Sequence, residues 1–261
     1  MIDFHNHILP GIDDGSKSTD ISLEMLTIAQ AQGITEVVNT VHFQHPKMNN
    51  KEISYKTIKE ETRLLQDLLN QNKINIKLHF GSEVYFLPNL IEIKNNPLTT
   101  FGYGKYMLIE FPLIQVPEVQ KKHLFELKLS GVTPIIAHPE RYITVQDNLS
   151  MITTWLEAGC LIQVDAGSIL GKLGKKSKVV AEKILKNGWC QIIGSDSHDN
   201  LNRNFCLEEA RDCVTQWVGL DCEKMFNENP KRVLEGKSIE VDFEYYNEEK
   251  NFFKKLIKRW A

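Results

Sequence analysis

The sequence lacks a long apolar run, since its longest uncharged apolar stretch is only a handful of residues, and no membrane-spanning segment is predicted. The first ten residues carry acid and histidine in place of the basic start and apolar core of a signal peptide. Basic residues are not in excess, because 31 Lys and Arg face 34 Asp and Glu, for a formal charge of −3. These absences argue against a membrane-spanning chain and against bulk binding of nucleic acid.

Cysteine is also scarce. Five cysteines in 261 residues are an odd number, which favours free thiols over a disulfide framework. Because free thiols are typical of reducing compartments, we expect a cytoplasmic protein. No Pro-, Gly- or Ser-rich linker, low-complexity segment or internal repeat divides the chain, so we expect a single main domain.

Seven short β-branched runs alternate with helical patterns along the chain. The predicted strands are residues 2–4, 34–41, 74–80, 106–109, 132–137, 161–164 and 189–193. The predicted helices are residues 18–32, 51–71, 117–129, 149–158, 177–186, 207–218 and 222–227. Nearly apolar strands separated by helices predict a parallel sheet buried on both faces, as either an open doubly wound sheet or a closed barrel.

Side chains that bind metals follow six of the seven predicted strands. They are His5, His7, His42, Glu83, Glu110, His138, Asp196 and His198. In a β/α barrel the carboxyl ends of the strands surround one mouth, whereas an open sheet would spread these groups along an edge. The pattern therefore favours a barrel of seven strands.

The same residues predict a metal centre. Mixed imidazole and carboxylate ligands suit Zn, Mn or Fe, whereas Mg and Ca prefer oxygen alone. With Asp14 from the first loop there are nine candidate ligands, which implies two or three ions. Taken alone, Asp14 is as compatible with a helix cap or a turn as with ligation. Three other histidines are interpreted as ordinary surface or core residues: His45, His79 and His123.

Six segments resemble the PHP (polymerase and histidinol phosphatase) superfamily. They are Asp3-Phe4-His5-Asn6-His7, Asp13-Asp14-Gly15, Gly81-Ser82-Glu83, Leu108-Ile109-Glu110-Phe111, Ile136-Ala137-His138-Pro139-Glu140-Arg141-Tyr142 and Gly194-Ser195-Asp196-Ser197-His198. Within the superfamily, the sequence is similar to the manganese-dependent protein-tyrosine phosphatases encoded with capsule and exopolysaccharide genes in bacteria. The resemblance runs from Met1 to about Gly236, and its ordered set of motifs is far more specific than the first histidine pair alone.

The resemblance implies a distorted seven-stranded β/α barrel of the PHP type with a trinuclear site. Carried over residue by residue, it implies one ion held by His5, His7, Glu83 and Asp196, a second by Glu83, Glu110 and His138, and a third by Asp14, His42 and His198. It also implies that Arg141 clamps phosphate, with Arg203 doing so from a less closely matching loop. Asp165 stands where relatives tend to carry amide or hydroxyl residues, and we interpret it as a turn residue rather than an added pocket acid.

This resemblance implies hydrolysis of phosphotyrosine on a protein, with a membrane-anchored bacterial tyrosine kinase of capsule or exopolysaccharide synthesis as the expected partner. The expected cofactors are two or three divalent transition-metal ions, Mn in the first place and Fe or Zn as alternatives, with a metal-bound hydroxide attacking phosphorus. The predicted catalytic residues are Arg141, Arg203 and Asp196, and no general acid is assigned. A thiol mechanism is excluded, because no cysteine has the Arg six positions on that thiol-dependent tyrosine phosphatases need.

The predicted phosphatase domain covers residues 1–237, and residues 238–261 are a tail. In residues 250–261, apolar side chains share one helical face opposite Lys and Arg. Our first interpretation is that this basic amphipathic segment docks on its own barrel or on a neighbour; the alternative is peripheral contact with an anionic membrane.

Three other functions stay open at this point. A histidinol-phosphate phosphatase would use the same fold and metals on a smaller substrate. A metal-dependent amidohydrolase also opens with His-x-His, although such barrels commonly carry a lysine where Glu110 stands here. A non-catalytic regulator could bind phosphotyrosine without cleaving it, but the full set of nine ligands argues against that.

Overall fold

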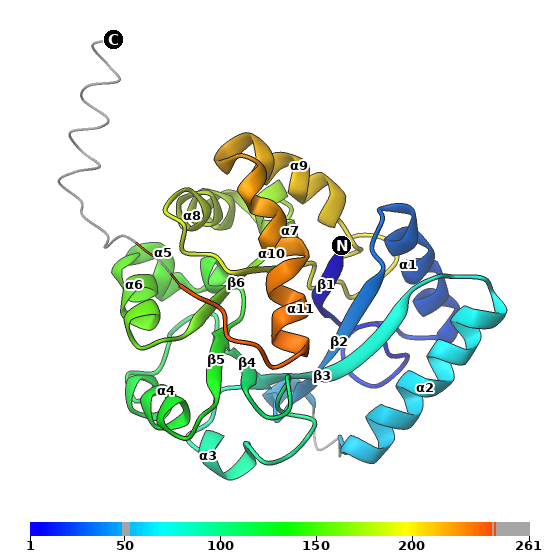
Figure 1. Cartoon of the computed structure of the whole chain (residues 1–261), viewed down its shortest axis with the longest axis horizontal. Helices are drawn as coiled ribbons and strands as arrows, with labels where there is room; N and C mark the ends of the chain where they lie inside the picture. Colours follow the sequence, from blue (N-terminus) through cyan, green and yellow to red (C-terminus); the bar gives the residue numbers. More distant parts are fainter. Residues whose placement is uncertain (49–52, 242, 244–261) are drawn as a thin grey trace.

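A parallel sheet of seven strands forms the centre of the molecule (Figure 1). The computed structural model describes residues 1–48, 53–241 and 243. The strands are β1 (Ile2–Asn6), β2 (Glu36–Phe43), β3 (Lys77–Tyr85), β4 (Tyr106–Glu110), β5 (Thr133–Ile136), β6 (Leu161–Asp165) and β7 (Ile192–Gly194). Each strand pairs in parallel with the next one along the chain.

The sheet curls until its first and last strands nearly meet. Asn6 of β1 forms a parallel bridge with Ser197, just beyond β7. The His7 amide donates to the Ser197 carbonyl over 2.8 Å, and the Asp196 amide donates to the His5 carbonyl over 2.7 Å. These bonds nearly close a seven-stranded barrel, so the predicted barrel is confirmed and the open sheet is excluded.

Helices surround the barrel. They are α1 (Thr19–Ala31), α2 (Tyr55–Gln71), α3 (Leu90–Ile93), α4 (Gln120–Leu129), α5 (Ile143–Asp147), α6 (Ser150–Glu157), α7 (Ala166–Leu170), α8 (Lys175–Lys186), α9 (Leu207–Val218), α10 (Glu223–Phe226) and α11 (Glu228–Leu234), with short 3₁₀ turns η1 (Pro46–Met48), η2 (Pro139–Arg141) and η3 (Leu220–Cys222). Serine caps begin the two longest helices: the Ser18 side chain accepts from the Ile21 amide, and the Ser54 side chain accepts from the Thr57 amide.

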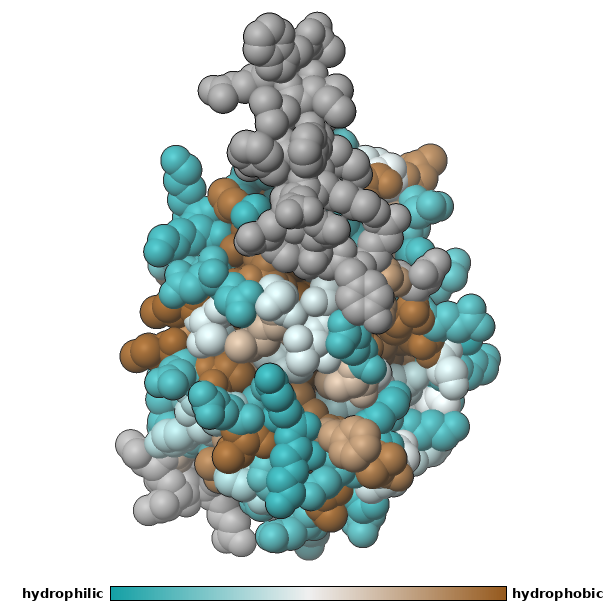
Figure 2. Space-filling model, turned by 90° about the vertical axis from the view of Figure 1, so that its left-hand side faces the viewer, coloured by the Kyte–Doolittle hydropathy of each residue, from teal (hydrophilic) through white to brown (hydrophobic). Residues whose placement is uncertain are grey.

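Two apolar clusters fill the barrel and its surroundings. The smaller one takes side chains from all strands except β3 and fills the interior, where Phe4 packs on Phe101 with ring centroids 5.0 Å apart. The larger one lies between the strands and the surrounding helices. On the face shown in Figure 2, apolar and polar residues are interspersed, as is usual for a protein surface.

An irregularity in β1 directs side chains into the barrel mouth. The β1–β2 register shifts by one residue between Asp3 and Asn6. As a result, Phe4 joins the interior apolar cluster while its neighbour His5 reaches the polar mouth above that cluster.

The structure changes several predicted boundaries. The third strand was predicted at residues 74–80 but runs over Lys77–Tyr85, so Glu83 lies inside the strand instead of after it. His5 and His42 also lie within their strands. The short helices α3, α5, α7 and α11 were not predicted from the sequence.

The chain continues along the barrel after α11. The Tyr106 hydroxyl donates to the Lys237 carbonyl over 2.6 Å, and Val241 and Phe243 pack against the larger apolar cluster. The predicted amphipathic segment at residues 250–261 and the start of the predicted helix at 51 lie outside the described residues. Within the described part of the chain, every helix is too short or too polar to cross a membrane.

Candidate metal centre

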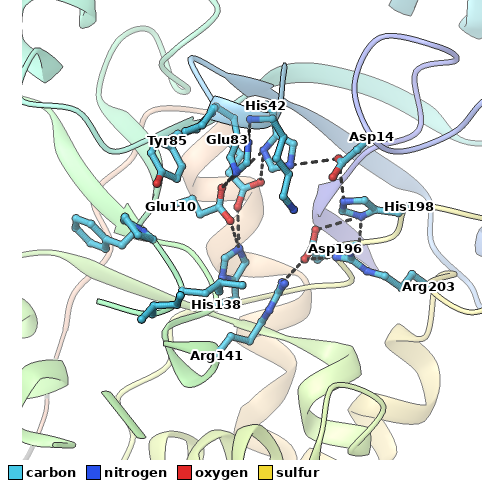
Figure 3. Close-up of a pocket in the computed structure, with 17 residues that line it drawn as sticks. Asp14, His42, Glu83, Tyr85, Glu110, His138, Arg141, Asp196, His198 and Arg203 are labelled. Atoms are coloured by element: carbon cyan, nitrogen blue, oxygen red, sulfur yellow. Dashed lines mark hydrogen bonds and ion pairs between the residues drawn. The ribbon is translucent and has the colours of Figure 1, made fainter. Parts of the chain in front are cut away.

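One cavity of about 410 Å³ opens at the carboxyl ends of the strands (Figure 3). Seven of the nine predicted ligands line its wall: Asp14, His42, Glu83, Glu110, His138, Asp196 and His198. Both predicted arginines line it too. His5 and His7 lie beneath it, fully buried against Glu83 and Asp196. The structure therefore brings together all the site residues that were predicted from the sequence.

Three groups of side chains contain the ligands that the resemblance implied, with His7 as a further member of the third group. A fourth group joins His42, His45 and Glu110. In the first, His5 Nε2 lies 3.2 Å from Glu83 Oε2, and His7 Nε2 lies 3.3 Å from Asp196 Oδ1. These four side chains are at most 3% exposed.

Glu83 connects the first group to the second. Its other carboxylate oxygen, Oε1, lies 2.8 Å from His138 Nε2, and Glu110 Oε1 lies 3.9 Å from the same nitrogen. In the third group, Asp14 Oδ1 lies 3.3 Å from His42 Nε2 and 3.3 Å from His198 Nε2. Asp14 is the most open member, since 37% of its side chain is exposed.

Several buried atoms at the centre of these groups have no hydrogen-bond partner. They are Nε2 of His5 and His7, Nδ1 of His42, Oδ1 of Asp14 and Oε2 of Glu110. Buried polar atoms are normally satisfied, so orphaned nitrogen and oxygen atoms fit divalent cations here, because they belong to groups in which the ligand atoms lie within 4.8 Å of one another.

The carboxylates differ in how easily they ionise. Burial opposes ionisation of Glu83, but the neighbouring His5 and His42 charges hold its pKa well below the usual range. Burial and the Glu83 charge raise the pKa of Glu110 to about 8. Concentrated carboxylates of this kind require positive charge, which protons or metal ions can supply.

Acceptors on the far side of the imidazole rings orient three of the histidines. His7 Nδ1 lies 2.7 Å from Asp13 Oδ2, His5 Nδ1 lies 3.0 Å from Gln163 Oε1, and His198 Nδ1 lies 2.9 Å from the Asp196 carbonyl oxygen. An acceptor at Nδ1 keeps the proton there and leaves the Nε2 lone pair for a metal. This role of Asp13 was not predicted, although Asp13 belongs to one of the motifs, and no sequence signal pointed to Gln163.

Two site residues adopt backbone conformations that side chains rarely take. His138 has φ 31° and Asp196 has φ 48°, both in the left-handed region. Each follows closely after a strand, β5 or β7, and turns its side chain into the mouth. Such conformations cost about 1–3 kcal/mol each, and tend to persist at functional sites.

The two arginines converge on one carboxylate. Arg203 Nη2 lies 2.7 Å from Asp196 Oδ2, and Arg141 Nη1 bonds to the same oxygen. Arg141 Nη1 also lies 3.5 Å from Asp165 Oδ2, while Asp165 Oδ1 caps α7 by accepting from the Gly167 amide over 2.7 Å. Asp165 is therefore both a capping residue and an acid facing Arg141.

The three histidines that were interpreted as ordinary residues have different surroundings. His79 pairs with Glu36 over 2.6 Å, and His123 lies 3.4 Å from Glu126, both outside the cavity. His45 instead lines the cavity, with Nε2 3.5 Å from Glu110 Oε2. Interpreting His45 as an ordinary histidine overlooked this position.

Comparison with known proteins gives a consistent set of relatives. The profile of the family described as capsular polysaccharide synthesis, CpsB/CapC, matches residues 1–235. The chain is 32% identical over 240 residues to the tyrosine-protein phosphatase YwqE of Bacillus subtilis, covering 92% of this chain and 93% of that one. It is 25% identical over 241 residues to the tyrosine-protein phosphatase CpsB of Streptococcus pneumoniae, covering 90% and 98%.

Solved structures agree with the sequence matches. The fold matches a crystal structure from work on YwqE and CpsB, described there as metal-dependent tyrosine phosphatases, with a TM-score of 0.88 and 28% identity over 95% of this chain and all of that one. A histidinol phosphate phosphatase from Lactococcus lactis shares the fold at a TM-score of 0.54 and 14% identity, covering 83% of this chain and 93% of that one. The resemblance stated from the sequence is thereby confirmed, and the chain belongs to the CpsB/CapC family of capsular polysaccharide synthesis.

Proposed function

We propose that this protein is a metal-dependent phosphatase that hydrolyses phosphotyrosine on a protein. One observation carries the proposal: nine imidazole and carboxylate side chains, several with orphaned buried atoms, gather at one cavity beside two arginines. Its membership of the CpsB/CapC family supports the same activity.

The residues present fit a polynuclear cation site. One ion would be held by His5, His7, Glu83 and Asp196, a second by Glu83, Glu110 and His138, and a third by Asp14, His42 and His198. Bound divalent ions supply an activated water near neutral pH and neutralise phosphate charge. Mixed nitrogen and oxygen ligands suit Mn, Fe or Zn, and we propose Mn as the ion used.

The arginines would bind the phosphate group. Both guanidinium groups pair with Asp196, which is also a proposed ligand of the first ion. We propose that, when Asp196 holds the ion, Arg141 and Arg203 donate instead to the phosphate oxygens. A guanidinium group can donate two hydrogen bonds to one phosphate at the same time. Asp165 keeps Arg141 beside the cavity in that arrangement.

The leaving group, a tyrosine oxygen, needs little proton donation from the protein. A tyrosine side chain has a pKa near 10, far below that of an alkyl alcohol, so its oxygen leaves with little need for full protonation. The cavity wall beside Tyr85 and Phe111 provides apolar surface for an aromatic ring.

We further propose that the substrate is a membrane-anchored bacterial tyrosine kinase of capsule or exopolysaccharide synthesis, and that the reaction takes place in the cytoplasm. Free thiols at all five cysteines are consistent with a reducing compartment. The cavity opens at the carboxyl ends of the strands, where we propose that a phosphotyrosine on a protein surface enters.

A combined experiment tests the activity. Purified protein is assayed on phosphotyrosine peptide, phosphoserine peptide and histidinol phosphate, after chelation, after Mn addition and after thiol alkylation, with its metal content measured in parallel. We expect a preference for phosphotyrosine that is lost on chelation, restored by Mn and unaffected by alkylation, because four cysteines are buried and none lines the cavity. Faster hydrolysis of histidinol phosphate, or activity that survives chelation, would overturn the proposal.

A further inference from the structure

His45 lines the cavity and belongs to none of the three implied ligand groups, although it forms a fourth candidate group with His42 and Glu110. Its ring centroid lies 4.5 Å from that of His42 and 4.8 Å from that of Tyr85, which meets it edge-on. Only 9% of the side chain is exposed, and Nε2 points toward Glu110. A histidine held this close to a metal-type cluster is either a further ligand or a group that faces the substrate.

The backbone before His45 is built to turn it into the cavity. Gln44 has φ 52°, in the left-handed region, and so reverses the chain directly after β2. Its side-chain amide exchanges two hydrogen bonds with Asn89, of 3.1 and 3.0 Å, and also donates to the Tyr85 carbonyl over 2.9 Å. These bonds tie the loop after β2 to the segment after β3 and fix the place of His45.

The hydrogen bond at Nδ1 distinguishes His45 from the candidate metal-ligating histidines. The Lys47 amide donates to His45 Nδ1 over 3.1 Å. A neutral imidazole that accepts at Nδ1 carries its proton on Nε2, so the nitrogen facing the cavity is a donor without a free lone pair. His5, His7 and His198 have the opposite arrangement, with an acceptor at Nδ1.

The surroundings of His45 indicate which part of a substrate it would meet. The arginines lie on the far side of the site from Tyr85, so the phosphate group belongs on that side (Figure 3). The near side carries Tyr85, which pairs with Glu110, the residue before the cavity-lining Phe111, so an aromatic ring would pack there. The oxygen that joins ring to phosphorus would then lie between them, near His45.

We propose that the Nε2–H of His45 donates a hydrogen bond to the phenolic oxygen of the substrate as the phosphate ester is cleaved. In this step the oxygen of a water molecule forms the new bond to phosphorus and releases a proton to solvent, and the bond from phosphorus to the phenolic oxygen breaks. The electron pair of that broken bond stays on the phenolic oxygen, which later takes a proton from solvent. The proton of His45 stays on the imidazole throughout, so this residue stabilises developing charge. The inference rests on the proposed function.

Two substitutions of similar size test whether His45 acts as a hydrogen-bond donor or only fills space in the cavity wall. His45→Gln keeps an N–H at the end of the side chain, whereas His45→Met keeps the volume without a donor. His123→Met, at the partly buried histidine on α4 outside the cavity, is the matched control. Each variant is assayed on aryl phosphates whose leaving phenols span a range of pKa, from 4-nitrophenyl phosphate to phosphotyrosine, and its Mn content is measured.

We expect His45→Met to lower kcat on phosphotyrosine by about 10- to 100-fold. This is at or below the loss usually seen when one hydrogen-bond donor to a developing charge is removed, because water can enter the cavity and replace part of the hydrogen bond. The loss should shrink as the leaving phenol becomes more acidic, since a better leaving group needs less stabilisation. His45→Gln should recover part of the rate, Mn content should match wild type in all variants, and His123→Met should leave rates unchanged.

Three results would overturn the inference: an equal loss on all leaving groups, no difference between Gln and Met at position 45, or a loss of bound Mn from His45→Met. The last would make His45 a metal ligand. The failure of the proposed function is recognised separately, because wild type would then fail to hydrolyse phosphotyrosine or would resist chelation.

Discussion

Asp13 offers a sharp test of the metal centre, because its carboxylate orients a ligand without lining the cavity. Asp13 Oδ2 lies 2.7 Å from His7 Nδ1 and also accepts from the His42 amide over 3.2 Å. Its other oxygen accepts from the Gly15 amide over 3.0 Å. In Asp13→Asn one oxygen becomes an amino group, so in either orientation that group faces an N–H donor.

The magnitude follows from this conflict. Asp13 is only 6% exposed, and leaving a buried donor unsatisfied costs about 1–3 kcal/mol of folding free energy. If the amino group faces His7, the ring loses the partner that keeps its proton on Nδ1. Changes of this kind beside a metal-bound histidine typically cost about 10- to 100-fold in metal affinity, and we expect that range here.

The assay is a calorimetric titration of the metal-free protein with Mn, together with denaturant unfolding. Asp3→Asn is the matched control, since Asp3 is also buried but bonds to the His5 amide and the Asn6 side chain instead of an imidazole. The control should bind Mn as wild type does. Equal Mn affinity in Asp13→Asn and wild type, or an equal loss in both variants, would refute the reasoning.

Three further predictions concern residues around the site. Asp165→Asn keeps an acceptor for the helix cap but removes the charge facing Arg141. We expect KM for phosphotyrosine to rise about fivefold in steady-state assays, which matches an ion pair worth roughly 1 kcal/mol. An unchanged KM would contradict this. Burial and the Asp165 charge raise the pKa of Glu140 from 4.5 to about 8, so the folded state holds that proton more tightly than the unfolded chain. Stability in urea should therefore fall as pH rises from about 4.5 to 8, and Glu140→Gln should flatten that fall; an identical pH profile would count against the assigned cause. Gly194→Ala would place a Cβ 2.6 Å from His5 Cβ. This overpacking should lower the free energy of unfolding by about 1–3 kcal/mol and therefore lower the thermal midpoint. An unchanged midpoint would contradict the close approach of β7 to His5.

The strand count and the clustering of the candidate ligands were predictable from sequence because the two signals are local and repeat. Each strand is a short apolar run, and each run but one ends near a histidine or a carboxylate that binds metals, so the barrel mouth could be inferred without knowing any register. Glu83 was placed after its strand rather than inside it, because the apolar pattern of β3 weakens at Gly81 and Ser82 although pairing continues to Tyr85.

Other features depend on contacts that sequence spacing does not encode. The place of His45 depends on a left-handed Gln44 and on an amide pair with Asn89, 45 positions away. The orientation of His5 depends on Gln163, a strand residue with no motif around it. Convergence of both arginines on Asp196 likewise required the folded arrangement of two separate segments, the turn after β5 and the loop after β7.

The seam between β1 and β7 has a consequence for how the protein is made. The ribosome makes His5 and His7 about 190 residues before Asp196 and His198. A nascent chain cannot assemble the first ligand group until those later residues are synthesised, so cation capture and closure of the barrel both wait for the loop after β7. Truncation before residue 196 should therefore yield a barrel that is open between β1 and β7 and that binds divalent cations more weakly.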